Sequence, residues 1–230
     1  MSTLILVRHG QSIWNLQNRF TGWVDVSLSR KGMEEAEQVG KMLAHTNIDV
    51  AFTSVLLRAQ DTLYEILKHN LYCQQYVRVH EKNQERYEHF TALAGDEAEL
   101  KIFMSENLNE RFYGDLQGLN KDKVRKQFGA EKVHQWRRSY DIPPPNGESL
   151  EMTAERTMPY FHQSIVPQLH DNKTVLVSAH GNSLRAIIMH IEKMTPAEIL
   201  NYELATGAPH IYEFDENLQI TNKKILTREP

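Results

Sequence analysis

The sequence predicts an α/β fold, with a mostly parallel sheet, one antiparallel edge strand, and helices on both faces of the sheet. Short apolar runs such as Leu4–Val7 and Val175–Ala179 are typical of strands buried on both faces. Segments with apolar residues at helical spacing follow these runs, as in sheets whose parallel strands are connected by helices. Near the end of the chain, the runs 211–214 and 218–226 predict a hairpin that would supply the antiparallel edge strand.

Length and composition favour one globular domain. With 230 residues the chain is long enough for one sizeable core and short for two, so we expect a single domain over residues 1–230. A hydrophobic content of 40% and a charged content of 24% are ordinary for such a domain. The net charge of −4 provides no electrostatic footprint for nucleic acid. A site for an anionic substrate would therefore have to concentrate positive charge locally.

The cysteine count and the apolar runs bear on location. Cys73 is the single cysteine, which excludes an internal disulfide and fits a reducing compartment. No apolar run approaches the length of a membrane span, and the N-terminus lacks the basic start and long apolar core of a signal peptide. We therefore expect a cytoplasmic protein with neither a membrane nor a nucleic-acid partner. A homodimer or a higher homo-oligomer is left open.

The first strand runs directly into a polar motif, Arg8-His9-Gly10. In open α/β sheets, ligand sites gather at the carboxyl ends of the strands. Arg8 and His9 would stand at such an edge, and Gly10 permits the sharp turn away from it. Ser12 and Asn15 supply further hydrogen-bonding groups around the turn.

A second apolar strand, far down the chain, ends in a similar motif. Val175–Ala179 is followed by His180-Gly181-Asn182-Ser183, so an apolar strand followed by His-Gly occurs twice. Two parallel strands lying side by side would bring His9 and His180 to the same edge of the sheet. A helix follows, and its N-terminus would face a bound phosphate. Arg185 on this helix is expected to be structural.

Two histidines with an arginine favour phosphoryl transfer. An imidazole is a good nucleophile toward phosphorus near neutral pH, and a second histidine with arginines can neutralise the oxygens of the transferring group. A zinc site is less favoured, because it needs three or four convergent ligands and Arg8 beside His9 would repel a cation. We therefore predict a reaction through a phosphohistidine, without a metal.

The segments between the two motifs predict helices and strands of a core. Ser29 would cap a helix over 30–45, and Val50–Thr53 would form the second strand. Ser54 would then introduce a helix that carries Arg58 in its first turn. Residues 71–99 lack a clean period and predict a helical excursion without identifiable chemistry. The core stripe expected on the first of these helices comprises Met33, Ala36, Gly40 and Leu43.

Residues 108–121 hold a second group of polar side chains. Glu110 supplies the carboxyl group that phosphoryl transfer to or from a hydroxyl requires, and an ion pair with Arg111 is the alternative interpretation. Tyr113 offers a hydroxyl to a substrate. Lys121 adds a positive charge.

The last part of the chain predicts helices separated by turns. Residues 121–140 should form two helical pieces broken at Gly129, the second of which ends in Arg137-Arg138. The proline-rich turn of residues 142–149 precedes a long helix to about residue 169. Pro159 and Pro167 are expected to kink or end that helix.

Together, these motifs resemble one protein family. Arg8-His9-Gly10 and His180-Gly181 resemble the signature motifs of the histidine phosphatase superfamily. Over most of the chain the resemblance is closer to its branch of 2,3-bisphosphoglycerate-dependent phosphoglycerate mutases. The blocks that carry the closer resemblance are Phe20-Thr21-Gly22-Trp23, Leu108-Asn109-Glu110-Arg111, Tyr113-Gly114, Leu116–Lys121, Trp136–Tyr140 and Ala179–Ser183.

The resemblance implies a glycolytic and gluconeogenic isomerase that interconverts 2-phosphoglycerate and 3-phosphoglycerate. It also implies 2,3-bisphosphoglycerate as the phosphoryl primer and no need for a metal. His9 would carry the phosphoryl group, Arg8, Arg58 and His180 would stabilise its charge, and Glu110 would act as acid and base. The residues implied to hold the substrate are Asn15, Thr21, Gly22, Tyr113, Lys121, Arg137, Arg138, Gly181 and Asn182.

The sequence departs from the family pattern in three places. Phe112 stands where the family usually has histidine, residues 71–99 resemble an insertion, and the turn at 142–149 is shorter than in many mutases. These departures keep open a histidine-type phosphatase that hydrolyses a small phosphorylated metabolite, although Lys121 and Arg137-Arg138 favour the mutase. A non-catalytic binding protein is the remote alternative, because such a protein would be expected to have lost one of the two histidines.

Overall fold

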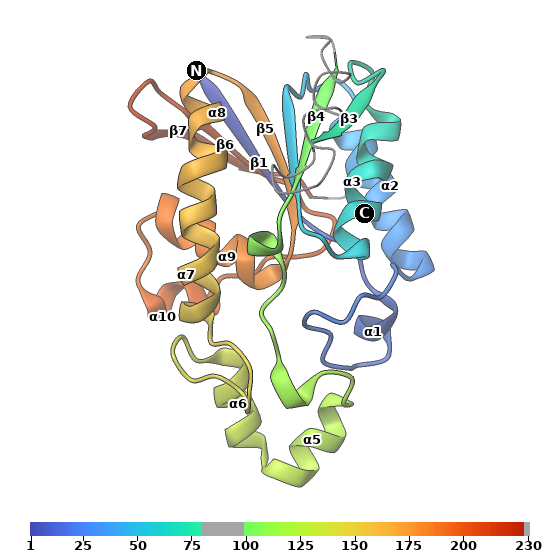
Figure 1. Cartoon of the computed structure of the whole chain (residues 1–230), viewed down its shortest axis with the longest axis vertical. Helices are drawn as coiled ribbons and strands as arrows, with labels where there is room; N and C mark the ends of the chain where they lie inside the picture. The colour runs from blue at the N-terminus through green and yellow to red at the C-terminus, as the bar shows by residue number, and fades with distance from the viewer. Residues whose placement is uncertain (80–98, 228–230) are drawn as a thin grey trace, which may run out of the picture.

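A central sheet organises the molecule (Figure 1). The computed structural model describes residues 1–79 and 99–227. The strands within these residues are β1 (Ser2–Arg8), β2 (Val50–Thr53), β3 (Tyr76–Val79), β4 (Leu100–Met104), β5 (Thr174–Ala179), β6 (His210–Phe214) and β7 (Ile220–Ile225).

The strand order is β3-β4-β2-β5-β1-β6-β7. The first five strands in this order are parallel, while β6 pairs antiparallel with β1 and β7 pairs antiparallel with β6. The predicted fold class is confirmed, and the hairpin contributes both of its strands to the antiparallel edge.

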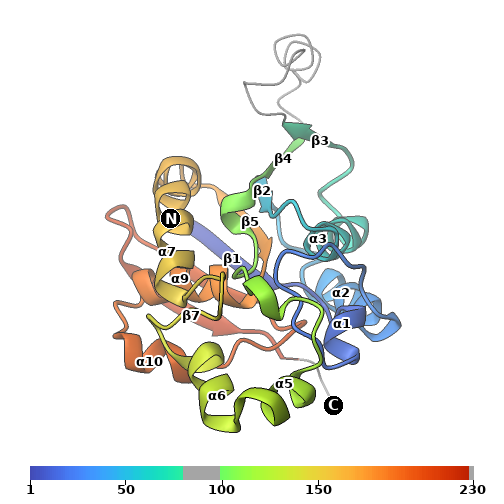
Figure 2. The ribbon, with the colours of Figure 1, turned by 60° about the horizontal axis from the view of Figure 1, so that its bottom comes forward.

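Helices cover both faces of this sheet. Figure 2 shows α2 and α3 on one side of the strands and α7 and α9 on the other. The described helices are α1 (Ile13–Leu16), α2 (Arg30–Met42), α3 (Leu57–His69), α5 (Lys121–Phe128), α6 (Ala130–Arg138), α7 (Leu150–Tyr160), α8 (Val166–His170), α9 (Gly181–Ile191) and α10 (Pro196–Asn201), with a π-helical turn at Phe161–Ile165 and short 3-10 helices at Glu106–Leu108 and Gly114–Leu116.

The strand β1 explains why both faces are covered. Leu4 and Leu6 pack into the cluster beneath α7 and α9, whereas Ile5 and Val7 pack into the cluster beneath α2 and α3. Since side chains alternate across a strand, a continuous apolar run must bury both faces of its sheet. Among residues 1–79 and 99–227, no helix combines the length and apolarity that crossing a membrane requires.

The helix α2 begins as predicted and corrects one detail. The side chain of Ser29 accepts a hydrogen bond from the backbone N–H of Gly32, which confirms the predicted cap. Ala36 and Leu43 are fully buried, but Met33 is 40% exposed, so its assignment to the core stripe is wrong. The buried stripe passes through Val39 instead and leaves Met33 at its rim.

The helical excursion expected over residues 71–99 is wrong where the structure describes that segment. Tyr76–Val79 forms β3, which pairs in parallel with β4 at the edge of the sheet. Its residues alternate between exposed and partly buried positions, the two-residue period of an edge strand. Residues 80–98 of the predicted excursion lie outside the described residues.

The predicted break between two helical pieces at Gly129 is confirmed. Gly129 separates α5 from α6 at a φ of 87°, a backbone conformation that glycine adopts without strain. The long helix after residue 149 contains Pro159 and then passes through the π-helical turn before α8. A π-helical turn next to a proline is a recognised way of bending a helix.

Candidate active site

The two His-Gly motifs meet at the carboxyl edge of the sheet. Arg8 is the register partner of Ala179, and the backbone N–H of His9 donates to the carbonyl of Ala179 at 3.0 Å. His9 and His180 therefore follow neighbouring strand ends, and their ring centroids lie 4.8 Å apart. This is the juxtaposition that the sequence predicts from two parallel strands.

His9 is held in one protonation form. Its Nδ1 lies 2.7 Å from the carbonyl oxygen of Gly10, which can only accept, so Nδ1 carries the proton and Nε2 keeps its lone pair. Burial, followed by the charges of Arg58 and Arg8, lowers the pKa of His9 to about 3. The ring is therefore a neutral imidazole at neutral pH, which is the nucleophilic form.

Gly10 is closely packed against the N-terminus of α2. Its N–H donates to the hydroxyl of Thr62 at 3.1 Å, and a Cβ at this position would meet the carbonyl oxygen of Gly32 at 2.2 Å. The N-terminus of α2 thus packs directly against the turn after β1. This contact fixes the carbonyl that holds His9 Nδ1.

Arg8 and Arg58 direct cationic groups toward the two histidines. Arg58 is 1% exposed, and its guanidinium donates to the carbonyls of Gly22 at 2.7 Å and Val24 at 3.1 Å. Burial lowers the pKa of Arg58 to about 10, so the group keeps its charge at neutral pH. Arg8 donates to the carbonyl of Leu204 at 2.9 Å.

Several buried donors near the histidines have no partner within the described part of the chain. Buried polar groups are normally hydrogen-bonded, so a cluster of unpaired donors indicates a ligand with acceptor oxygens. The atoms concerned are Arg8 Nε, Arg58 Nε, Arg111 Nε, Thr21 Oγ1 and His180 Nδ1.

Glu110 is a buried carboxylate fixed by three N–H groups. Its Oε1 accepts from the backbone N–H of Arg111 at 2.9 Å and from the backbone and side-chain nitrogens of Asn182 at 3.1 and 2.7 Å. Burial by itself would raise the pKa of Glu110, but Arg8 and these N–H donors outweigh it and lower the pKa to about 2. The group is thus an ionised carboxylate at neutral pH.

The ion pair between Glu110 and Arg111, the alternative from the sequence, is replaced by other contacts. The guanidinium of Arg111 donates to the hydroxyl of Tyr113 and to the carbonyl of Arg137, both at 3.2 Å. Arg111 therefore links two parts of the cavity wall, and its backbone rather than its side chain contacts Glu110.

Arg156, which the sequence did not predict as part of the site, holds the backbone of the segment that carries Glu110. The guanidinium of Arg156 forms two 2.9 Å contacts with the carboxylate of Glu148 and donates to the carbonyls of residues 106, 107, 109 and 110. Glu148 also accepts from the backbone N–H of Phe112 at 2.8 Å. Trp23 Nε1 donates to the carbonyl of Glu110 at 2.6 Å, so this loop tryptophan anchors the same segment.

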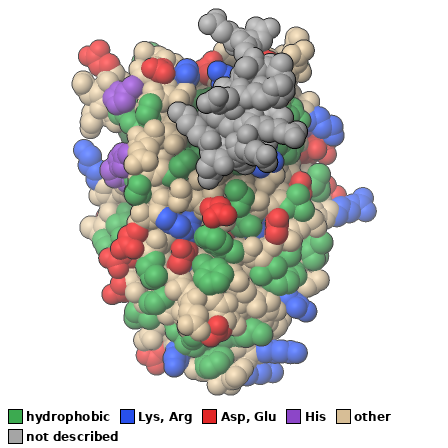
Figure 3. All heavy atoms as spheres, viewed as in Figure 1, with side chains coloured by type: hydrophobic (Ala, Val, Ile, Leu, Met, Phe, Trp, Pro, Cys, Tyr) green, Lys and Arg blue, Asp and Glu red, His purple; other side chains and the backbone are tan. Residues whose placement is uncertain are grey.

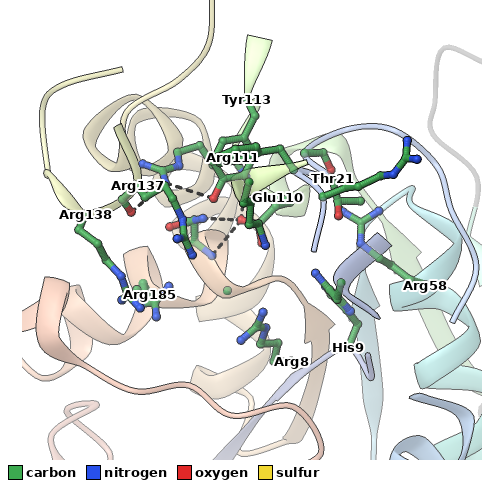
Figure 4. Close-up of a pocket in the computed structure, with 17 residues that line it drawn as sticks. Arg8, His9, Thr21, Arg58, Glu110, Arg111, Tyr113, Arg137, Arg138 and Arg185 are labelled. Carbon is green, nitrogen blue, oxygen red and sulfur yellow. Dashed lines mark hydrogen bonds between the residues drawn. The ribbon is translucent and has the colours of Figure 1, made fainter. Parts of the chain in front are cut away.

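These side chains surround one cavity, which Figure 4 shows with Arg138 and Arg185 on one side and Arg58 on the other. All the predicted site residues line it except His180, which packs against His9. Eight of the lining residues are lysine or arginine and Glu110 is the single carboxylate among them. Figure 3 shows acidic and basic side chains interspersed over one face of the molecule, so the cavity concentrates positive charge in a chain of net charge −4.

Four lining residues were not predicted as part of the site, namely Arg19, Phe20, Arg111 and Arg185. The expected structural role of Arg185 is found as well, since its guanidinium donates to the carbonyl of Tyr202 at 3.2 and 3.3 Å. Phe20 and Arg111 lie inside sequence blocks that carried the family resemblance, so a signal for them existed. Arg19 and Arg185 had no such signal, because only the fold brings them to the cavity.

A metal ion fits this cluster poorly. His9, Glu110 and His180 each offer a ligand atom, and these atoms lie within 4.8 Å of one another. However, Glu110 Oε1 already accepts three hydrogen bonds, and the positive charges of Arg8 and Arg58 act on all three residues. The charge of the surroundings suits an anion.

Comparison with known proteins gives the class of the chain. A model of the histidine phosphatase superfamily (branch 1) matches residues 4–93 and 83–223. The chain therefore belongs to the histidine phosphatase superfamily.

Curated relatives place the chain within that superfamily. A 2,3-bisphosphoglycerate-dependent phosphoglycerate mutase of Pseudoalteromonas atlantica is 63% identical over 98% of this chain and 100% of the relative. A 2,3-bisphosphoglycerate-dependent phosphoglycerate mutase of Protochlamydia amoebophila is 48% identical over 97% of this chain and 100% of the relative. The chain belongs to the family of 2,3-bisphosphoglycerate-dependent phosphoglycerate mutases.

Solved structures support the fold. Bacillus stearothermophilus YhfR has a TM-score of 0.74 at 24% identity, with 96% of this chain and 94% of that chain covered. A mycobacterial glucosyl-3-phosphoglycerate phosphatase in complex with VO3 also has a TM-score of 0.74, at 20% identity and with 99% of both chains covered. At these identities the similarity shows a shared fold and nothing more specific.

Proposed function

We propose that this chain interconverts 2-phosphoglycerate and 3-phosphoglycerate through a phosphorylated His9. The observation that carries the proposal is a neutral imidazole with a free Nε2 in a cationic cavity, beside an ionised carboxylate. The identity of 63% to a protein named as a 2,3-bisphosphoglycerate-dependent phosphoglycerate mutase supports the same reaction.

The cavity residues fit the bisphosphorylated primer that this family uses. When bound, 2,3-bisphosphoglycerate supplies the phosphoryl group that primes His9. Its two phosphates and its carboxylate need cationic partners beyond those next to the nucleophile, and the cavity has cations on opposite sides (Figure 4). The residues proposed to hold it are Asn15, Thr21, Gly22, Tyr113, Lys121, Arg137, Arg138, Gly181 and Asn182.

The phosphoryl group moves between a nitrogen and an oxygen. In the step toward the enzyme, His9 Nε2 forms a bond to phosphorus as the bond from phosphorus to the substrate oxygen breaks. In the return step, a substrate hydroxyl oxygen forms the new bond as the bond to His9 Nε2 breaks. Arg8, Arg58 and His180 stabilise the charge on the phosphoryl oxygens in both directions.

Glu110 is proposed to carry the proton. Because its pKa is about 2, it begins as a base and takes the proton of the hydroxyl that attacks phospho-His9. The proton then remains on Glu110 for return to the leaving oxygen in the opposite step. An anionic phosphoryl group would offset Arg8 and Arg58, the charges that lower this pKa, and so assist proton uptake.

A coupled assay of 3-phosphoglycerate conversion, run with and without 2,3-bisphosphoglycerate, tests the proposal. The expected result is formation of 2-phosphoglycerate that depends on the primer. Release of inorganic phosphate without 2-phosphoglycerate would instead establish the phosphatase alternative, which the short turn at 142–149 and Phe112 favour. The absence of both products would support the binding protein.

We also propose a cytoplasmic location and a homodimer or a higher homo-oligomer. An intracellular reducing compartment suits a chain whose one cysteine, Cys73, is unpaired. Light scattering of the purified protein measures the oligomeric state, and a monomer at all concentrations would contradict the second of these proposals.

A further inference from the structure

Ser54 contacts His180 in the interior, behind the cavity. It follows the last residue of β2, and β2 pairs with β5, the strand that leads into His180. The Oγ of Ser54 lies 2.7 Å from Nε2 of His180, and both residues are fully buried. The sequence suggested a different role for Ser54, as the residue that introduces α3. That helix is preceded by Leu56, whose backbone N–H donates to the Ser54 hydroxyl at 3.1 Å.

The hydrogen of the Ser54 hydroxyl decides the direction of this contact. Its oxygen already accepts from Leu56 N–H, and within the described residues His180 Nε2 is the one acceptor found for its hydrogen. A buried hydroxyl hydrogen without an acceptor is costly, so Ser54 donates to Nε2. His180 Nε2 must then carry the lone pair.

The remaining nitrogen of His180 therefore carries the proton. Burial, followed by the charge of Arg58, lowers the pKa of His180 well below its usual value, so the ring holds a single proton. With Nε2 as acceptor, that proton sits on Nδ1. This Nδ1 is buried and has no partner within the described part of the chain, while the ring lies 4.8 Å from that of His9.

We propose that Ser54 is a positioning residue that holds the proton of His180 on Nδ1, so that a neutral imidazole donates a hydrogen bond to the phosphoryl group. The inference rests on the proposed function. In the other tautomer, Nδ1 would present a lone pair to the phosphoryl oxygens, and two acceptors would face each other. Ser54 thus acts on the reaction through the tautomer of another residue, without touching the substrate.

The tautomer can be measured directly. Two-bond ¹H–¹⁵N correlation spectra of the uniformly labelled full chain distinguish a protonated Nδ1 from a protonated Nε2, and His180→Gln assigns the signals. We expect Nδ1–H in the wild type and a mixture, or Nε2–H, in Ser54→Ala. Ser54→Thr keeps a hydroxyl and should keep the wild-type tautomer.

Ser178→Ala is the matched control. Ser178 is also fully buried near the same strand ends, and its hydroxyl donates to the carbonyl of Ala59 at 2.9 Å without touching a histidine. The two alanine variants should lose similar thermal stability. Only Ser54→Ala should lower kcat, by about 10-fold to 100-fold with KM little changed, because one donor to the transferring group is weakened.

Affinity for orthovanadate keeps this test separate from the proposed function. It should fall in Ser54→Ala and not in Ser178→Ala, whether or not the enzyme converts phosphoglycerate. A wild-type protein with Nε2–H, or a Ser54→Ala variant that keeps both Nδ1–H and full vanadate affinity, would overturn the inference. If the wild type shows no mutase activity but the tautomer and vanadate results are as expected, only the proposed reaction is overturned.

Discussion

Two groups of residues face the same cavity and differ in how they are held. The strand-tip cluster consists of His9 and His180 at the strand ends and Arg58, which reaches them from the first turn of α3. Each of these residues is at most 2% exposed. The rim cluster, Lys121, Arg137 and Arg138, lies on α5 and α6 beyond the carboxyl ends of the strands and is half-buried or exposed (Figure 1).

The support of the two clusters differs as well. Gly10, Ser54 and the carbonyls of Gly22 and Val24 fix the strand-tip cluster at 2.7 to 3.1 Å. The rim cations repel one another: burial, then Arg137, lowers the pKa of Lys121. The difference between the clusters indicates that phosphoryl transfer depends on a rigid, desolvated nucleophile, whereas substrate binding depends on cations whose mutual repulsion a bound anion relieves. We therefore expect strand-tip substitutions to lower kcat and rim substitutions to raise KM.

The largest effect is expected for His9→Ala. Without Nε2 no bond to phosphorus can form, so turnover should fall by roughly 10⁴-fold or more, and labelling by 2,3-bisphosphoglycerate should disappear. Acid-labile phosphate on the labelled protein is the measurement. The control is His45→Ala, because His45 is exposed and lies in the connection between α2 and β2. Acid-labile phosphate retained on His9→Ala would contradict the assignment of the nucleophile.

A smaller effect, mainly on KM, is expected for Arg137→Gln in the rim cluster. A charge-assisted hydrogen bond contributes about 1.5–3 kcal/mol, so KM should rise roughly 10-fold to 100-fold while kcat changes little. Since Arg137 is close to other cations, the variant should unfold at no lower temperature than the wild type. Steady-state kinetics and thermal unfolding give both values.

The control for Arg137→Gln is Arg125→Gln. Arg125 is exposed on α5, pairs with Asp122 at 3.0 Å, and does not line the active-site cavity. Its KM should equal that of the wild type. A large fall in kcat for Arg137→Gln with unchanged KM would remove the proposed division between the two clusters.

The strand-tip cluster should also make stability depend on pH. In the unfolded chain a histidine binds its proton near its usual pKa of 6.5, whereas burial, then Arg58 and Arg8, keep the pKa of folded His9 at about 3. Between these values the unfolded chain binds more protons, so the His9 contribution is complete above about pH 6.5 and is lost as the pH falls. Each pH unit in this window costs about 1.4 kcal/mol for His9 alone.

Urea unfolding between about pH 7.5 and about pH 5.5 measures this dependence. His9→Gln cannot bind a proton at that site, so its unfolding free energy should depend less steeply on pH than that of the wild type. An unchanged slope would show that His9 is not held neutral by its surroundings. No corresponding change in slope is expected for Arg137→Gln, because arginine stays charged throughout this range.

The smallest effect is expected for Phe112→His. The Phe112 ring contacts Trp23 edge-on with centroids 5.8 Å apart, and it does not line the cavity. The contact with Glu148 uses the backbone N–H of residue 112, which any side chain preserves. We expect kcat to rise or stay level, within about threefold. A large loss of kcat would indicate that the phenylalanine is adapted to another substrate.

The sequence predicted most of the site because the decisive residues follow strands. Arg8 and His180 come directly after apolar runs, and parallel strands align such ends at one edge. The same reasoning was weaker where no strand end marked the position. The helical spacing predicts a buried Met33, which lies at the rim of its helix, and the pattern over 71–99 does not predict the edge strand Tyr76–Val79.

Local sequence by itself determined the buried strands, the helix cap at Ser29, and the place of His9 and His180 just after strand ends, because these follow from side-chain periodicity and short-range hydrogen bonds. The tertiary structure alone decided that Ser54 meets His180 and that Arg185 reaches the cavity. It also decided that Arg156 holds the segment of Glu110. Ser54 and His180 are 126 positions apart in the chain and meet through the pairing of β2 with β5. Arg156 and Glu110 are 46 positions apart. No local pattern encodes these contacts, since they depend on burial and on how the strands and helices pack.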